Sequence, residues 1–180
     1  MCGINGLIDI KKNLNQDQIR EFIKNFNLSL KHRGPDGNGL EIINNIGLGH
    51  TRLSIIDLSI NGKQPMFSRN KKVVISYNGE IYNFENLKEK YLKNYKFISN
   101  TDTEVLLNLY TEIGIENLIK ELNGMYAFSI YDIEKNKIFL SRDKIGKKPL
   151  YYYFGSDYII WSSELKTFKV SPINNNLEMS

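Results

Sequence analysis

The chain has 180 residues, of which 41% are hydrophobic and 24% are charged, and its formal net charge is +4. This composition is typical of a globular protein of one domain, and it excludes collagen-like, low-complexity and largely disordered classes. One cysteine and two histidines exclude a disulfide scaffold, an all-cysteine metal site and a three-histidine zinc centre. No stretch approaches the roughly 18 apolar residues of a membrane helix, and no secretory signal is present. Because the lysines, including the doublet Lys147-Lys148, are dispersed, we expect them to lie on the solvated surface and not to bind nucleic acid. Without a membrane helix or a secretory signal, we expect a cytoplasmic protein that does not bind a membrane.

The N-terminal half of the chain predicts one long helix among strands. Ile19, Phe22 and Ile23 begin an apolar series at helical spacing, and Asn15 before them is a favourable N-cap. The turn formers of Arg33-Gly34-Pro35-Asp36-Gly37 indicate a loop after this helix. The elements predicted for this half are a strand over 3–9, a helix over 15–31, a loop over 32–39, strands over 40–43 and 47–54, and a strand over 72–77 that ends at the turn dipeptide Asn78-Gly79.

The C-terminal half predicts helices first and hairpins after them. Thr101-Asp102-Thr103-Glu104 is typical of a capping box, and Gly114 is expected to end the helix that it opens. The elements predicted for this half are helices over 84–92, 101–114 and 115–122, strands over 125–132 and 137–142 around one hairpin turn, and strands over 151–154 and 158–161 around another. Short turns between strands favour antiparallel sheets with helices packed outside them, which is an α+β domain. We expect this domain to cover residues 1–170 and to be followed by a polar tail over 171–180.

Cys2 is the first candidate catalytic residue. A lone cysteine is more often a small buried hydrophobe, but removal of Met1 would leave Cys2 with a free α-amine beside its own thiol. Such an amine has a pKa of about 7.7–8.0, so it could serve as the base that activates the thiol. His32 and His50 are the alternative bases, and a Cys–His pair stays open at this point. The loop over 33–37 could be a rigid turn only, or could brace the Cys2 amine or cover the pocket.

Three other sites suit the binding of a free amino acid. Arg52 ends an apolar strand, where its guanidinium could lie on the surface or grip a carboxylate in bidentate fashion. Asn78 and Gly79 could form a simple turn or offer two donors to an oxyanion, and Glu80 could accept from an ammonium. Asp102 could complement a helix dipole or bind an amine. Together with a thiol that carries its own base, these groups could hold an amino acid at both ends and attack its side-chain acyl group.

Seven stretches of the chain resemble, in the same order, the motifs of one family. The stretches are Met1-Cys2-Gly3-Ile4, His32-Arg33-Gly34-Pro35-Asp36-Gly37, Arg52-Leu53-Ser54-Ile55-Ile56-Asp57, Asn78-Gly79-Glu80-Ile81-Tyr82-Asn83, Thr101-Asp102-Thr103-Glu104, Gly124-Met125-Tyr126-Ala127-Phe128 and Arg142-Asp143-Lys144-Ile145-Gly146-Lys147-Lys148-Pro149-Leu150-Tyr151-Tyr152. The chain is thereby similar, from Met1 to about Phe168, to the glutaminase domain of class II, N-terminal-nucleophile glutamine amidotransferases. The branch that it most resembles is that of the glutamine-hydrolysing asparagine synthetases.

The resemblance implies a fold and a set of site residues. The fold is a four-layer αββα sandwich of mainly antiparallel sheets. The implied reaction is hydrolysis of glutamine to glutamate and ammonia through a γ-glutamyl thioester on Cys2, with Asn78 and Gly79 at the oxyanion. The implied substrate-binding residues are Arg52 for the α-carboxylate, Glu80 and Asp102 for the α-amine, Asn78 and Gly79, and also Leu53, Ser54, Ile55 and Ile56.

The synthetase half of such enzymes has no counterpart in this sequence. No Ser-Gly-Gly-x-Asp-Ser pyrophosphate loop occurs, so we expect this chain to hold no metal or other cofactor, and expect ATP and Mg only on the synthetase domain. The resemblance implies glutamine as substrate and an ATP-dependent synthetase domain or subunit as partner, which would use the ammonia to make asparagine from aspartate. A homodimer is left open. The alternative is a truncated or non-catalytic regulatory or interaction module of the same fold, and a weaker one is an unrelated Cys–His hydrolase.

Overall fold

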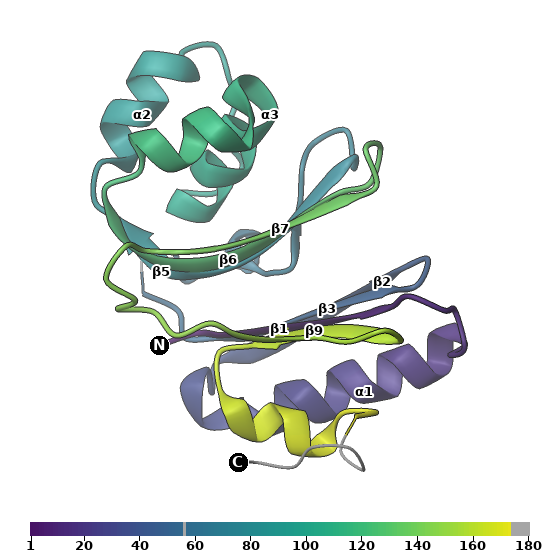
Figure 1. Ribbon diagram of the computed structural model, residues 1–180. Helices are drawn as coiled ribbons and strands as arrows, with labels where there is room; N and C mark the ends of the chain where they lie inside the picture. The colour runs from purple at the N-terminus through teal and green to yellow at the C-terminus, as the bar shows by residue number, and fades with distance from the viewer. Residues whose placement is uncertain (56, 174–180) are drawn as a thin grey trace.

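Two antiparallel sheets packed face to face form the centre of the computed structural model, which describes residues 1–55 and 57–173 (Figure 1). The five-stranded sheet has the order β2-β3-β1-β9-β8, and the four-stranded sheet has the order β4-β5-β6-β7. Their strands are β1 (Gly3–Asp9), β2 (Gly37–Ile43), β3 (Ile46–Arg52), β4 (Met66–Phe67), β5 (Val73–Ile81), β6 (Gly124–Asp132), β7 (Lys137–Arg142), β8 (Tyr151–Phe154) and β9 (Tyr158–Ser162).

Helices cover the outer face of each sheet (Figure 1). The five-stranded sheet packs against α1 (Gln16–Ser29), and the four-stranded sheet packs against α2 (Phe84–Tyr91) and α3 (Asp102–Glu121). Short 3₁₀ turns occupy Lys31–Arg33, Ile60–Gly62 and Leu165–Val170. The layers therefore follow the order helix, sheet, sheet, helix, and the predicted αββα sandwich of mainly antiparallel sheets is confirmed. None of the helices in the described ranges is long and apolar enough to cross a membrane.

Strand β1 is buried on both faces because it lies in the middle of the sandwich. Successive side chains of a strand point to opposite faces. Ile4 and Ile8 accordingly pack between the two sheets, whereas Leu7 packs in the apolar cluster that α1 covers. Asn5 also faces α1, and its side-chain amide donates to Oδ1 of Asn27 at 2.8 Å. The five-stranded sheet is thus held to both neighbouring layers through this one strand.

The caps of the two long helices form where the sequence predicts them. Asn15 accepts from the N–H of Gln18, whose side chain bonds back to the N–H of Asn15, which completes a capping box. Thr101 accepts from the N–H of Glu104 at 3.2 Å. Gly114 breaks the helix direction with a φ of 72° inside the range of α3, so the two helices predicted on either side of it are joined without a loop.

The predicted turn at Asn78-Gly79 is wrong, because both residues lie inside β5. They pair with Ala127 and Tyr126 of β6 in an unbroken antiparallel ladder. The reason for the glycine is close packing: a Cβ at Gly79 would lie 2.4 Å from the main-chain oxygen of Met125. Glycine is required here by the neighbouring strand, although in sequence it is indistinguishable from a glycine required by a turn.

The packed part of the chain extends slightly beyond the predicted domain of residues 1–170. Ile173 is 4% exposed and packs with Phe168 in the apolar cluster beneath α1. The first residues of the predicted polar tail are therefore part of the core, because an isoleucine within it has apolar partners to pack against. The rest of that tail, residues 174–180, lies outside the described residues.

Gly6→Ala is expected to destabilise the fold. Gly6 lies opposite Trp161 of β9, and a Cβ on Gly6 would come within 2.0 Å of the indole ring. Forcing the buried Trp161 aside should lower the free energy of unfolding by about 1–3 kcal/mol, the usual cost of overpacking. Urea denaturation measures this change. Gly37→Ala is the control, because a Cβ at Gly37 meets nothing within 4 Å; equal stability of the two variants would contradict the packing described here.

Candidate active site

A pocket lined by Cys2, the end of β3, β5 and the start of α3 collects the predicted site residues. Its volume of about 110 Å³ is several times the roughly 10–15 Å³ that a cavity needs to hold one water molecule, so it has room for a small molecule. All predicted site residues that the structure describes line it: Cys2, Arg52, Leu53, Ser54, Ile55, Asn78, Gly79, Glu80 and Asp102. The remaining predicted residue, Ile56, lies outside the described residues.

The Cys2 side chain is held against the main chain that follows β3. Its Sγ lies 3.3 Å from the nitrogen and 3.5 Å from the oxygen of Leu53. Burial raises the pKa of the thiol, and the Leu53 hydrogen bond and nearby positive charges only partly oppose this effect. The loop over 33–37, predicted as a possible brace for the Cys2 amine, instead holds its carbonyl, to which Arg33 Nε donates at 3.0 Å. Met1, which precedes Cys2 in the chain, also lines the pocket.

Arg52 ends β3 with its guanidinium in the pocket. The guanidinium donates to the main-chain oxygens of Ser59, at 2.8 Å, and Asp57. These bonds fix the loop after β3 around the arginine. A Cβ at Gly62 would lie 2.4 Å from Nη2 of Arg52, so a glycine is needed there for the guanidinium to fit. The predicted carboxylate clamp therefore has a fixed position at the pocket wall.

Asn78 presents a buried amide with a free donor. The residue is 2% exposed, and its Nδ2 has no hydrogen-bond partner among the described residues. Buried side-chain donors are nearly always paired. A donor left unpaired in the wall of a pocket is arranged to meet an acceptor on a ligand, so Asn78, with its neighbour Gly79, suits the predicted oxyanion role.

Asp102 links the start of α3 to β5 as well as lining the pocket. Its Oδ2 accepts from the Tyr77 hydroxyl at 2.6 Å and from the N–H of Ile81 at 2.9 Å. Burial raises the pKa of Asp102, and these hydrogen bonds oppose the rise. Glu80 is exposed and lines the same pocket, so two carboxyl groups belong to its wall. This pair suits the binding of an ammonium group.

His50 lines the pocket but makes no hydrogen bond to Cys2 among the described contacts. It is 1% exposed, and its Nε2 lies 3.1 Å from the oxygen of Tyr77, so Nε2 carries the ring proton. Burial lowers the pKa of His50 to about 4. His32, the other candidate base, bonds to Glu164 at 2.8 Å and does not line the pocket. Neither histidine forms the Cys–His pair that the sequence left open.

Lys148 is a pocket residue that the sequence analysis placed on the solvated surface. It is 6% exposed and lines the pocket beside Cys2, and burial lowers the pKa of its ammonium. The Asp143 carboxylate holds the main chain at this position, because it accepts from the N–H groups of Lys147 and Lys148 at 2.8 Å and 3.0 Å. These bonds pull the chain after β7 inward. No composition signal in a lysine doublet indicates such burial.

The residues 1–180 match the family described as Glutamine amidotransferase domain. This chain belongs to the glutamine amidotransferase domain family. The curated relatives include a putative asparagine synthetase [glutamine-hydrolyzing] 2 of Methanocaldococcus jannaschii, which is 47% identical over an alignment that covers 92% of this chain and 34% of the relative. Asparagine synthetase B of Escherichia coli is 39% identical, with 92% of this chain and 29% of the relative covered. The amidotransferase domain thus spans about a third of the length of these relatives.

Solved structures place the amidotransferase domain in the same fold. The glutamine phosphoribosylpyrophosphate amidotransferase of Bacillus subtilis, complexed with ADP and GMP, superposes with a TM-score of 0.77 at 22% identity, over 94% of this chain and 43% of that chain. At this identity the likeness concerns the fold alone. Within residues 1–55 and 57–173 there is no group of three or more His, Cys, Asp or Glu residues that could hold a metal ion; that the domain functions without a cofactor stays a prediction.

The stability of the domain is expected to depend on His50 at mildly acid pH. The pKa of His50 in the folded chain, about 4, lies below the ordinary value of about 6.5. As the pH falls below about 6.5, His50 therefore binds a proton in the unfolded chain but stays neutral in the folded chain. Between pH 8 and pH 5 this should remove about 2 kcal/mol of stability, a loss that is complete below pH 4. Urea unfolding of the wild type and His50→Gln at both pH values measures it, and an identical pH dependence in the two proteins would contradict the buried neutral ring.

Proposed function

We propose that this domain hydrolyses glutamine to glutamate and ammonia through a thioester on Cys2. The observation that carries the proposal is the unpartnered Asn78 amide in a pocket that is also lined by a thiol and a guanidinium. The family and the names of its relatives support glutamine as the substrate.

The pocket offers a distinct partner for each charged group of glutamine. Arg52 binds the α-carboxylate through a bidentate fork, and Asp102 and Glu80 bind the α-ammonium. These contacts fix the amino acid so that its side-chain amide meets the sulfur of Cys2. Leu53, whose main chain holds that sulfur, positions the thiol at the same time. Both charged groups on the α-carbon of the substrate are therefore bound by side chains that take no part in bond making.

The chemistry starts from the α-amine that removal of Met1 gives to Cys2. Because burial raises the pKa of the thiol, a base must take its proton, and the neighbouring amine is suited to do so near neutral pH. The sulfur attacks the amide carbon, and the oxyanion that forms accepts hydrogen bonds from Asn78 Nδ2 and the Gly79 N–H. Return of the proton to the departing nitrogen releases ammonia and leaves a thioester, which water hydrolyses to glutamate while the thiol is restored.

The proposal extends to a partner that consumes ammonia. The relatives of this domain are named glutamine-hydrolysing asparagine synthetases, and the domain covers 34% and 29% of two of them. We therefore infer that the ammonia passes to an ATP-dependent synthetase domain or subunit that converts aspartate to asparagine. ATP and Mg would bind on that partner, and the chemistry assigned to the residues here needs no cofactor.

A non-catalytic module of the same fold is the second candidate. The observation that favours it is the raised pKa of the buried Cys2 thiol, which stays protonated and unreactive unless a base takes its proton. A protein that retains Met1 would lack the base that the thiol requires. Intact-mass measurement of the purified protein separates the two candidates, because the catalytic form must lack the mass of one methionine.

Cys2→Ala should abolish glutamate release, because no thioester can form without the sulfur. The measurement is glutamate production from glutamine by protein whose intact mass shows that Met1 is removed. Ser141→Ala, a change on β7 outside the pocket, serves as the control. Absence of glutamate release from the processed wild type, even with a synthetase partner present, would overturn the proposed function.

Arg52→Lys should weaken glutamine binding more than it slows the chemical step. A lysine keeps the charge but cannot form the planar fork, and loss of one charged hydrogen bond should raise KM by about 10- to 100-fold. Initial rates over a range of glutamine concentrations separate KM from kcat. Arg69→Lys is the matched control, because Arg69 is exposed and does not line the pocket. An unchanged KM in Arg52→Lys would contradict the proposal that Arg52 binds the α-carboxylate of glutamine.

A further inference from the structure

We propose that Glu164 is a positioning residue that acts through Arg33 to hold the main chain of Cys2, and with it the nucleophilic sulfur, in place. This inference rests on the proposed function, since it concerns how the same nucleophile is aimed. Glu164 lies just after β9 and does not line the pocket, so it cannot act on the substrate directly.

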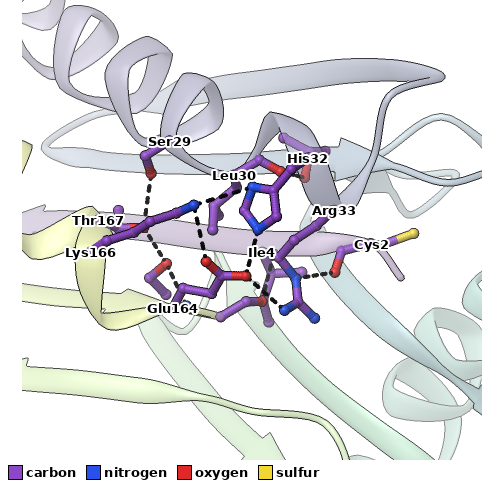
Figure 2. Close-up of polar contacts among 12 residues, drawn as sticks. Cys2, Ile4, Ser29, Leu30, His32, Arg33, Glu164, Lys166 and Thr167 are labelled. Carbon is purple, nitrogen blue, oxygen red and sulfur yellow. Dashed lines mark hydrogen bonds and ion pairs between the residues drawn. The ribbon is translucent and has the colours of Figure 1, made fainter.

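A chain of two hydrogen bonds connects Glu164 to Cys2 (Figure 2). The carboxylate accepts from Nη1 of Arg33 at 3.0 Å, and Nε of the same guanidinium donates to the carbonyl oxygen of Cys2 at 3.0 Å. Figure 2 shows the guanidinium between the two residues, with His32 and Lys166 on the other side of the carboxylate. Three segments that are distant in sequence therefore meet at one cation.

Cys2 needs this support because it lies beyond the strand ladders. Pairing with β3 begins at Gly3, which is opposite Thr51, and pairing with β9 begins only at Asn5. Among the described contacts, the partner of the Cys2 carbonyl is Arg33. Chain ends fray unless they are tied down. Once Met1 is removed, Cys2 is itself the chain end, so the Arg33 bond holds its main chain while the Leu53 main chain contacts its sulfur.

Arg33 in turn needs Glu164 because its guanidinium is buried. Its side chain is 9% exposed, and Nη2 has no partner among the described residues. A buried cation that loses its anion is strongly destabilised and moves towards water. Burial disfavours ionisation of Glu164, but hydrogen bonds from Arg33, His32 and Lys166 outweigh it and hold its pKa below the ordinary value. The carboxylate is therefore charged at neutral pH and keeps the guanidinium in place.

The test compares Glu164→Gln with Lys166→Ala. Lys166 Nζ lies 3.3 Å from the same carboxylate and makes no bond with Arg33 among the described contacts. Without Lys166 the carboxylate keeps Arg33 at 3.0 Å and His32 at 2.8 Å as partners, so Lys166→Ala is a matched control. Small misplacements of a nucleophile slow the chemical step, and we expect Glu164→Gln to lower kcat by about tenfold or more while KM for glutamine stays the same. The rate at which iodoacetamide alkylates Cys2 should also differ between Glu164→Gln and the wild type. Lys166→Ala should match the wild type in both measurements.

Arg33→Lys is the second variant and keeps the inference testable if Glu164→Gln folds poorly. A lysine cannot bond the Cys2 carbonyl and the carboxylate together in the geometry of the fork, so kcat should fall as in Glu164→Gln. The double variant should lose no more than either single variant, because both changes break one connection. Additive losses, or a wild-type kcat and alkylation rate in Glu164→Gln, would overturn the inference.

Failure of the proposed function remains distinguishable from failure of this inference. A wild-type protein that releases no glutamate contradicts the proposed function, and the alkylation rates of Cys2 then test the Glu164 connection without turnover. A wild type that hydrolyses glutamine beside an equally active Glu164→Gln variant contradicts this inference alone.

Discussion

The antiparallel pairing of β1 with β3 is the interaction on which the site depends. Gly3 lies opposite Thr51, so the residue that precedes β1 must lie beside the residues that end β3. This register places the sulfur of Cys2 against the main chain of Leu53 and next to the guanidinium of Arg52. A slip of one residue would turn every side chain of β1 to the opposite face. The proposed nucleophile and the proposed carboxylate clamp are thus positioned by one ladder of hydrogen bonds.

Polar contacts between the two sheets complete the site. Ser76 of β5 donates to the oxygen of Gly49 at 2.9 Å, and Nε2 of His50 meets the oxygen of Tyr77 at 3.1 Å. The apolar packing between the sheets is not directional, whereas these hydrogen bonds fix β5 relative to β3. They set the place of Asn78, the next residue along β5. A buried neutral histidine therefore serves the site by holding its two halves together.

Local signals in the sequence were sufficient for most elements of the fold. The caps at Asn15 and Thr101 and the break at Gly114 depend on neighbours within a few residues, and the structure has all three. The turn expected at Asn78-Gly79 was wrong, because the close approach of the neighbouring strand, and not a turn, requires that glycine. The αββα layers were predicted from the family resemblance, because no single stretch of residues indicates them.

The residues of the site likewise include some that the sequence indicated and some that it did not. The residues inferred from their chemistry and from the resemblance meet in one pocket, but Lys148 and Glu164 gave no signal of their own. The main chain at Lys148 is held by the carboxylate of Asp143, and Glu164 reaches Cys2 only through Arg33. Such supporting residues are recognised by contacts between distant segments. A sequence without the fold cannot show which charged residues on its loops make those contacts.

The most direct test of the central claim is covalent labelling with a chloromethyl ketone analogue of glutamine, in which the reactive carbon replaces the side-chain amide nitrogen. If the Cys2 thiol faces a glutamine pocket, protein that lacks Met1 should form a single adduct per chain, and peptide mass mapping should locate it on Cys2. Added glutamine should protect Cys2 against this labelling. An adduct on another residue, or labelling of Cys2 that glutamine does not slow, would contradict the claim that this thiol faces a glutamine pocket.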